Sequence, residues 1–207
     1  MFNLLKRSSH DSRELRLESE RLILRTPVME DWSDWVQLRS ESREFLQPWE
    51  PSWPRDALTQ AAFRRRLRNQ ARDREAGAGY SFFVVRREDN QVMGGVTLSE
   101  IRRGVAQAST LGYWIGQRHA QRGYMAEAVE TVTAYVFQSL ELHRLEAACL
   151  PVNEPSRRLL EARGFKMEGL AQSYLKIDGV WRDHLLFALI DSSWRERIAS
   201  SKRGNPD

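Results

Sequence analysis

The segment from residue 111 to 129, LGYWIGQRHAQRGYMAEAV, places a glycine and two arginines where a strand passes into a helix. The first amides of a helix have no partner inside the helix, and the helix dipole adds positive potential at the same end. Gly123 would let a ligand approach this backbone closely, and Arg118 and Arg122 would add charge. The pattern is typical of a phosphate-binding loop, although many strand–glycine–helix junctions serve packing alone.

A second pair of candidates, Asn153 and Ser156, lies about 30 residues downstream in PVNEPSRRLLEARGF. The two residues stand one turn apart where a helix is expected to begin, so both side chains can face the end of the preceding strand. Capping is the alternative, because Asn is a favoured N-cap residue and Ser is common in a first helical turn.

Several other chemistries lack their motifs. The dinucleotide fingerprint G-x-G-x-x-G and a Walker loop ending in Gly-Lys-Ser/Thr are absent, and no nucleophile elbow is visible. The histidines show no metal-ligand spacing, and the single cysteine, Cys149, has no disulfide partner and no CxxC neighbour. We therefore expect no metal site, and we interpret Cys149 as a small buried apolar side chain.

Hydrophobic patterns predict an α/β fold with one mixed sheet that positions these candidates. An Asp-Gly pair between two alternating apolar runs, 166–177 and 180–190, predicts a hairpin. The segment QPWEPSWP contains three prolines, so it must form a rigid loop that displays tryptophan. In chain order the expected elements are a strand (21–25), a helix (27–46) capped by Asp31, the loop (47–54), an arginine-rich helix (57–75), three antiparallel strands (79–86, 91–101, 107–115), a helix (124–140), a strand (144–150), a short helix (153–164) and the hairpin.

The composition fits one folded domain. The chain has 207 residues, of which 41% are hydrophobic and 29% charged, which excludes disordered, collagen-like and coiled-coil chains. We expect a single domain at 15–195 between flexible segments at 1–14 and 196–207. No apolar run reaches membrane-spanning length and the first residues lack the apolar centre of a signal peptide, so we expect a cytoplasmic protein.

The formal net charge of +4 has a local origin, because residues 55–76 contain seven arginines and three acidic residues, a surplus of four. On the helix expected there, Phe63, Leu67 and Ala71 recur every four residues and form a buried stripe, so the arginines face outward. This face is either simply solvated or meets an acidic partner such as ribosomal RNA.

Three of these segments, LGYWIG, QRHAQRGYMAEA and NEPSRRLLEARGF, together resemble the acetyl-CoA-binding core of the GNAT N-acetyltransferases, and the resemblance extends over residues 21–194. FLQPWEPSWP, the RRG turn before LGYWIGQ, and YLKIDGVWRDH are similar to the RimJ-like members, which acetylate the N-terminal alanine of a small-subunit ribosomal protein. The resemblance implies a mostly antiparallel sheet of about seven strands, flanked by about four helices. The strands ending near Ile115 and Leu150 would part at its middle and admit the pantetheine arm of acetyl-CoA.

The resemblance also implies a cofactor site at this gap. Pyrophosphate would bind the backbone amides of residues 122–126, Asn153 would hydrogen-bond the pantetheine, and Ser156 would lie near the thioester sulfur. Ala120 stands where the family usually has Gln or Arg, and Met125 where it has Gly or Ala, so we expect Met125 to crowd the phosphate. The implied cofactor-binding residues are Trp114, Ile115, Arg118, Arg122, Gly123, Tyr124, Met125, Ala126, Asn153 and Ser156.

Acetyl transfer to an amine needs a neutral nucleophile, a polarised carbonyl group and a proton donor for the leaving thiolate. Ser156 is the first candidate for the proton donor, and Tyr174 is the second. Some family members carry a catalytic glutamate where this chain has Ser109. A carboxylate that assists through water would therefore be Glu50 or, second, Glu100, and a surface or capping role is the alternative for each.

The missing glutamate bears on the acceptor. Neutralising a lysine amine of pKa about 10.4 costs roughly 4.6 kcal/mol at pH 7, whereas an α-amine near 7.7–8.0 costs only about 1–1.4 kcal/mol. The sequence thus favours a protein N-terminus, in agreement with the RimJ-like resemblance. The candidate acceptor-binding residues are Trp49, Glu50, Trp53 and Asp183. The alternative role of the tryptophans is to pin the loop to the core, and that of Asp183 is a structural ion pair with a nearby arginine.

Two other functions remain open at this stage. A small amine, such as an aminoglycoside, a polyamine or an amino acid, is a second type of acceptor for the same chemistry. A ribosome- or RNA-binding assembly factor that only retains the fold is a third hypothesis, and the basic helix at 57–75 would then provide the ribosome contact. The sequence is compatible with a monomer or a dimer.

Overall fold

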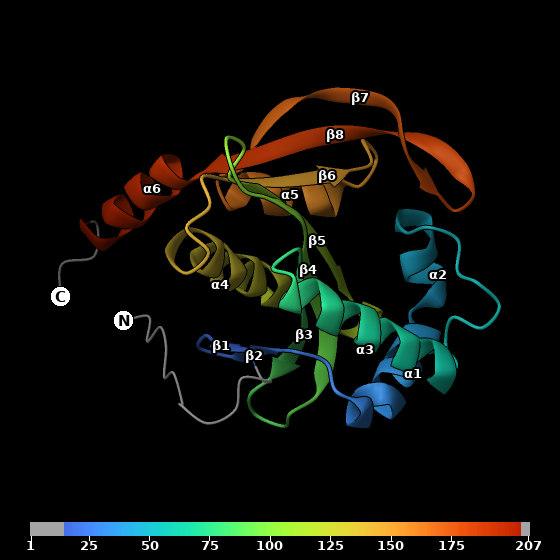
Figure 1. Ribbon diagram of the computed structural model, residues 1–207. Coiled ribbons are helices and arrows are strands. Elements are labelled where there is room, and N and C mark those ends of the chain that lie inside the picture. Colours follow the sequence, from blue (N-terminus) through green and yellow to red (C-terminus); the bar gives the residue numbers. More distant parts are fainter. Residues whose placement is uncertain (1–14, 204–207) are drawn as a thin grey trace.

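The computed structural model describes residues 15–203 and contains one eight-stranded sheet (Figure 1). The strand order is β1-β2-β3-β4-β5-β6-β8-β7, and every neighbouring pair is antiparallel except β5 and β6, which are parallel. The strands are β1 (Arg16–Glu18), β2 (Leu22–Arg25), β3 (Tyr80–Arg86), β4 (Val92–Arg102), β5 (Ala108–Ile115), β6 (Arg144–Cys149), β7 (Lys166–Ile177) and β8 (Val180–Ile190).

Six α-helices accompany this sheet within the described residues. The predicted α/β class and the mostly antiparallel mixed sheet are therefore confirmed, with eight strands instead of about seven and six α-helices instead of about four. The helices are α1 (Trp32–Glu41), α2 (Arg43–Leu46), α3 (Gln60–Glu75), α4 (Tyr124–Gln138), α5 (Glu154–Ala162) and α6 (Asp191–Arg203), with short 3-10 helices η1 (Met29–Asp31), η2 (Gln47–Trp49) and η3 (Gln117–His119).

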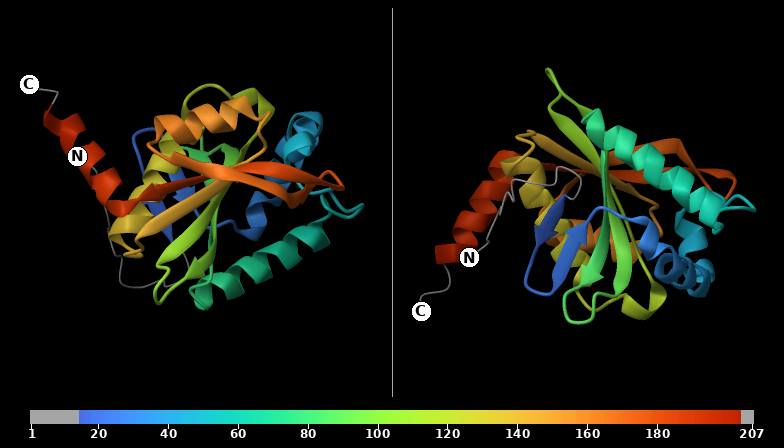
Figure 2. Two further views of the ribbon diagram at one scale, coloured as in Figure 1. Left: turned by 90° about the horizontal axis from the view of Figure 1, so that it is seen from above. Right: turned by 60° about the horizontal axis from the view of Figure 1, so that its bottom comes forward.

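The sheet buries apolar side chains on both faces, because successive residues of a strand point to opposite sides. On β3, Val84 packs in the larger cluster with α4, whereas Phe83 and Val85 pack in a smaller cluster with α1 and α3. Helices α3 and α4 accordingly lie on opposite faces of the central strands (Figure 2). The predicted helix at 124–140 and the burial of Phe63 on α3 are both confirmed.

The predicted long helix at 27–46 is wrong, because the chain breaks at Ser42 into α1 and α2. Asp31 stands at the N-cap position of α1 but makes no side-chain cap. Its carboxylate instead accepts hydrogen bonds from the Arg25 guanidinium at 2.8 and 2.5 Å and from the Val28 amide at 2.8 Å. An ion pair with the neighbouring strand thus takes the acceptor that a helix cap would have used.

The end of the chain is more ordered than the sequence suggested. Residues 196–203, expected as part of a flexible tail, belong to α6, whose Trp194 is buried and packs against Phe137 at 5.6 Å between ring centroids. The Glu130 carboxylate on α4 accepts hydrogen bonds from Trp194 and Arg197 and so joins α6 to α4. The segments expected to be flexible at 1–14 and 204–207 lie outside the described residues.

The hairpin of β7 and β8 turns at residues 178–179, as predicted. Its tip meets the loop at residues 47–54, called the tryptophan-rich loop below (Figure 1). The Gln47 side chain donates to the Asp178 carboxylate at 3.1 Å, and the Asp178 amide donates to the Glu50 carbonyl at 2.9 Å. These bonds join two segments that lie far apart in sequence. Within residues 15–203, no helix combines the length and apolarity needed to cross a bilayer.

Candidate active site

The two parallel strands part in the middle of the sheet. β5 and β6 are paired only from Ala108 and Arg144 to Leu111 and Ala147. The rest of β5, residues 112–115, stays paired with β4, and the end of β6 stays paired with β8. The edge of β5 beyond Leu111 therefore presents backbone groups that β6 does not satisfy, and an extended ligand can bind there. The predicted gap between these strands is confirmed.

Helix α4 begins directly at one side of this gap. Gly123 is its N-cap residue, with φ of 78°, a left-handed conformation that favours glycine, and no side chain caps the helix. Within the described residues, the amides of 123–126 meet no protein acceptor. The helix thus offers the unpaired donors and positive potential that the sequence predicted for a phosphate group.

The side chain of Met125 does not crowd this loop, so that expectation was wrong. It is buried in the larger core cluster with Ala128, Val129 and Val132 of the same helix. Only its backbone amide remains available, as do those of Tyr124 and Ala126. A small residue at this position is therefore not needed to keep the loop open.

The arginines of the loop differ in how they are held. Arg118 pairs with Glu41 at 2.9 Å and donates to the His119 ring at 3.1 Å, whereas the Arg122 side chain is exposed. Burial and the nearby guanidinium groups of Arg118, Arg86 and Arg122 lower the pKa of His119 to about 4. The loop therefore keeps a neutral imidazole beneath a surface of positive charge at pH 7.

Ser156 lies on the opposite side of the gap, and its hydroxyl oxygen is 2.7 Å from that of Tyr113. Asn153 caps α5 by accepting a hydrogen bond from the Ser156 amide at 3.2 Å, so the capping alternative is realised, and a contact with pantetheine stays a prediction. Burial raises the pKa of Tyr113 above its ordinary value, and the bond from Ser156 only partly offsets this. The phenol is therefore protonated at neutral pH.

The sequence reasoning missed Tyr113. The residue belongs to β5 just beyond Leu111, the last residue paired with β6, and this position is its only sequence signal. Cys149, at the end of β6, is buried as predicted, and burial raises the pKa of its thiol, which favours an inert neutral side chain.

A cavity of about 490 Å³ opens on the other face of the same strand end. It lies between α1, the tryptophan-rich loop, α3 and β5, and Tyr113 connects it with Ser156. Among the expected acceptor-binding residues, Glu50 and Trp53 line it. The lining residues are Trp35, Arg39, Glu50, Pro51, Ser52, Trp53, Pro54, Ala57, Leu58, Ala62, Phe63, Arg66, Thr97, Gly112, Tyr113 and Trp114.

Glu50, the first candidate for a base, is fully engaged. Its two carboxylate oxygens accept from the buried Arg39 guanidinium at 2.7 and 2.6 Å, and Trp53 donates to one of them at 2.8 Å. The Arg39 guanidinium also lies over the rings of Trp53 and Trp114, at 4.2 and 4.8 Å from their centroids. These contacts favour a structural role for Glu50 and for Trp53 in shaping the cavity.

Glu100, the second candidate, lies beside the paired part of β5. It is exposed, accepts a hydrogen bond from the Thr110 hydroxyl at 3.0 Å, and does not line the cavity. Ser109, which stands where some family members have glutamate, is buried in the paired part of the same strand. Neither candidate, Glu50 or Glu100, therefore brings a free carboxylate to the splayed end of β5.

Three further candidates lie outside the cavity. Trp49 is half-buried in η2, and Tyr174 is exposed on β7 with its ring edge toward His184. Asp183 is exposed and accepts a hydrogen bond from the Ser173 amide at 2.8 Å, which is a local structural contact. Their proposed roles stay predictions. Within residues 15–203, no group of three or more His, Cys, Asp and Glu side chains could hold a metal ion.

Comparisons with known proteins agree with this geometry. The family model described as an acetyltransferase (GNAT) domain matches residues 21–166. A probable N-acetyltransferase, YjcK of Bacillus subtilis (strain 168), is 34% identical over 84% of this chain and 97% of its own length. The [Ribosomal protein uS5]-alanine N-acetyltransferase of Escherichia coli (strain K12) is 33% identical over 87% of this chain and 93% of its own.

A solved structure is similar in the same way. Mycobacterium smegmatis RimJ in complex with CoA-disulfide has a TM-score of 0.80 and 27% identity, and the match covers 91% of this chain and 94% of that one. The parted strands, the open start of α4 and the match of a family model to most of the sequence lead to one assignment. The chain belongs to the GNAT family and is an N-acetyltransferase.

Proposed function

We propose that this enzyme transfers the acetyl group of acetyl-CoA to the N-terminal α-amine of a ribosomal protein. The uS5-alanine acetyltransferase relative and the RimJ structure with coenzyme A support this proposal. The observation that carries it is the position of Tyr113, which lines the cavity proposed for the acceptor and shares a hydrogen bond with Ser156 at the gap between β5 and β6. The acceptor and donor sites would thus meet at Tyr113. A cytoplasmic location follows from such a substrate.

The coenzyme would supply the activated thioester, and the chain's own groups would hold and protonate it. The amides of 123–126 would bind the phosphates, and the free edge of β5 beyond Leu111 would bind the extended arm. The Ser156 hydroxyl would donate its proton to the departing sulfur and regain one from Tyr113. Tyr113 is protonated at neutral pH, and the proton that the amine loses on acetylation would restore its phenol.

The electrostatics of the cavity favour an α-amine as the nucleophile. Among residues 15–203, Glu50 is the only one with a carboxylate that lines the cavity, and Arg39 holds it. Without a free base, an amine that is already partly neutral at pH 7 reacts most easily. An α-amine satisfies this condition, because deprotonating it costs about 3 kcal/mol less than deprotonating a lysine.

The same charges disfavour polycationic acceptors such as aminoglycosides and polyamines. Arg39 and Arg66 both line the cavity, against the single acidic side chain of Glu50. Small cationic acceptors are attracted by an acidic cleft, and this one carries a net positive charge. A peptide N-terminus brings one cationic group and a long neutral backbone, which such a cavity tolerates better.

The exposed face of α3 would hold the enzyme close to ribosomal RNA. Arg64, Arg68 and Arg72 recur every four residues along this face, and all three are exposed. The helix borders the cavity through Phe63 and Arg66, so RNA on the arginine face would lie near the acceptor. Replacing Arg64 and Arg68 with Gln should lower the salt-sensitive association with 30S particles and leave acetylation of a free peptide unchanged.

The test is acetylation of defined acceptors with labelled acetyl-CoA, with the modified atom located by mass spectrometry. A peptide with the N-terminal sequence of uS5, ribosomal proteins, a polyamine and an aminoglycoside would be compared. The proposal expects acetyl on the α-amine of the peptide and none on its lysine side chains. A peptide whose N-terminus is blocked is the control, and acetylation of that peptide or of the small amines alone would refute the proposal.

A further inference from the structure

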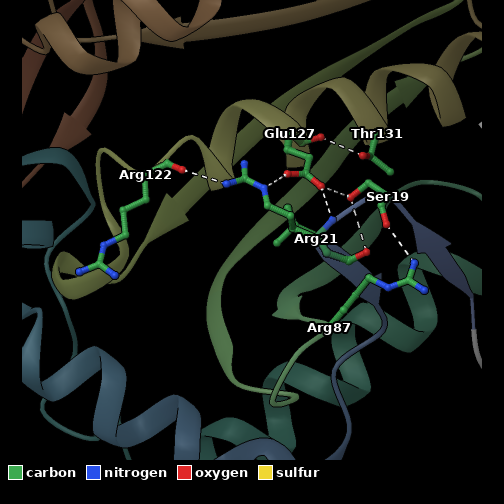
Figure 3. A network of polar contacts seen from close by, with 7 residues as sticks. Ser19, Arg21, Arg87, Arg122, Glu127 and Thr131 are labelled. Carbon is green, nitrogen blue, oxygen red and sulfur yellow. Dashed lines mark hydrogen bonds and ion pairs between the residues drawn. The ribbon is translucent and has the colours of Figure 1, made fainter.

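The turn between β1 and β2 contacts the start of α4. Arg21, in this turn, contacts both Glu127 in the first turn of α4 and Arg122 in the loop before this helix (Figure 3). Its guanidinium Nε donates to Glu127 Oε2 at 2.7 Å, and its Nη1 donates to the backbone carbonyl of Arg122 at 3.3 Å. The same guanidinium lies over the ring of Tyr124, at 4.8 Å from the centroid. One side chain therefore contacts the residues on both sides of Gly123.

The contact with the Arg122 carbonyl determines where the next amide points. The peptide bond between Arg122 and Gly123 is trans, because the described residues contain no cis peptide. In a trans peptide the C=O and N–H groups point in opposite directions. When Arg21 holds the carbonyl toward β2, the Gly123 N–H is turned away from β2, where no protein group accepts it.

Glu127 would oppose anion binding if it were left alone. It is the only acidic residue in the first turn of α4, beside the amides that would hold phosphate. The Arg21 amide, the Arg21 guanidinium and the Ser19 hydroxyl donate to its carboxylate at 2.8, 2.7 and 2.7 Å. Burial alone would raise the pKa of Glu127, but these bonds lower it below its ordinary value, so the group is ionised and needs a counter-charge.

We infer that Arg21 is a positioning residue for coenzyme binding, which orients the Arg122–Gly123 peptide toward the pyrophosphate and cancels the charge of Glu127. This inference rests on the proposed binding of acetyl-CoA at α4. Neither the glycine loop nor the helix start contains this residue, because it comes from a turn more than 100 positions earlier in the chain.

Calorimetric titration of the acceptor-free enzyme with coenzyme A tests the inference. Arg21→Gln should weaken binding at least tenfold, and Arg21→Lys, which keeps the charge but not the two-sided contact, should weaken it less. Arg87→Gln is the matched control, because Arg87 holds the same turn through the Ser19 carbonyl at 2.9 Å without contacting the loop (Figure 3). Its affinity should equal that of the parent.

A second replacement separates charge from simple loss of structure. If Arg21 cancels the charge of Glu127, Glu127→Gln should restore at least half of the lost binding free energy in the Arg21→Gln background. If the ion pair only stabilises the fold, Glu127→Gln should not restore coenzyme binding in the Arg21→Gln background. With acetyl-pantetheine, a donor without the pyrophosphate, Arg21→Gln should leave kcat/KM within about twofold of the parent.

The outcomes distinguish the inference from the function beneath it. A parent enzyme that does not bind coenzyme A overturns both. A parent that binds, together with an Arg21→Gln variant of equal affinity, overturns only the role of Arg21. Equal loss with the two donors, or no rescue by Glu127→Gln, also overturns it. Melting temperatures of all variants show whether each is folded, and Arg21→Lys provides the comparison if Arg21→Gln is not.

Discussion

The two sides of the gap between β5 and β6 are built in different ways. The side proposed to bind the phosphates, called the phosphate side, consists of successive backbone amides at the start of α4, and one left-handed glycine exposes them. The side proposed to bind the acceptor, called the acceptor side, consists of side chains from α1, the tryptophan-rich loop, α3 and β5, and the ion pair of Arg39 and Glu50 holds them. A backbone site depends on local conformation, whereas a side-chain site depends on contacts between distant segments. The two sides should therefore fail differently when they are altered.

The acceptor side should respond to Glu50→Gln mainly by losing stability. The substitution leaves the Arg39 guanidinium, whose side chain is 10% exposed, without its counter-charge, and the loss of one partner of such a pair costs about 3 kcal/mol. We expect that decrease in the free energy of unfolding in urea, and no change in the shape of the pH profile of kcat/KM.

Glu100→Gln is the control for this effect, because Glu100 is exposed and accepts only from Thr110. Its stability should stay within about 0.5 kcal/mol of the parent. If Glu50→Gln were stable and lost the acid limb of the pH profile instead, Glu50 would be the base, and the acceptor side would be more than a structural frame.

The hydroxyl pair that joins the two sides should affect turnover. Ser156→Ala should lower kcat about 100-fold with little change in coenzyme affinity, because it removes the proposed proton donor and leaves the α4 amides intact. Tyr113→Phe should lower kcat about tenfold. If the two act as one relay, the double variant is no slower than Ser156→Ala. Single-turnover kinetics would measure these rates, with Tyr135→Phe, in the core under β3, as the matched tyrosine control.

The phosphate side should respond to a charge in the backbone loop. Gly123→Glu places a carboxylate beside the amides of α4 and should weaken coenzyme binding at least tenfold, about 1.4 kcal/mol, by calorimetry. Gly77→Glu introduces the same side chain at another left-handed glycine, with φ of 63°, after α3. Both variants put a side chain on a left-handed residue, so an equal loss of affinity would mean that backbone strain, and not charge at the loop, is responsible.

The contrast between the two sides also explains what the sequence could predict. The strands of the hairpin, the start of α4 and the cap at Asn153 follow from local patterns, and they match the structure closely. The break at Ser42 and helix α6 were missed, because a buried Trp194 and its bond to Glu130 on another helix stabilise the latter.

Within the site, the local features were again the predictable ones. The positions of Gly123 at the start of α4 and of Ser156 in the first turn of α5 follow from their motifs, whereas the contacts of Arg21 and Tyr113 are with partners distant in sequence, and no motif marks such pairs. The error at Met125 was avoidable. Met125, Ala128, Val129 and Val132 are spaced by three, four and seven residues, a pattern that assigns Met125 to the buried face of the helix.

The smallest expected effect concerns pH and the phosphate side. The pKa of His119 is about 4 in the folded protein, below the ordinary value of 6.5, because the ring is buried among arginines. Between these two values the unfolded chain binds more protons than the folded one, so this contribution to stability is complete above about pH 6.5 and is lost as the pH falls toward 4.

His119→Gln keeps a polar side chain but removes this titration. Its melting temperature should therefore fall by a few degrees less than that of the parent between pH 7 and pH 5, as measured by scanning calorimetry. The exposed His143, replaced with Gln, is the control and should follow the parent curve. Parallel curves for parent and His119→Gln would show that burial and the neighbouring arginines do not lower the pKa of this ring, and that the loop beside α4 holds the imidazole less tightly than its burial indicates.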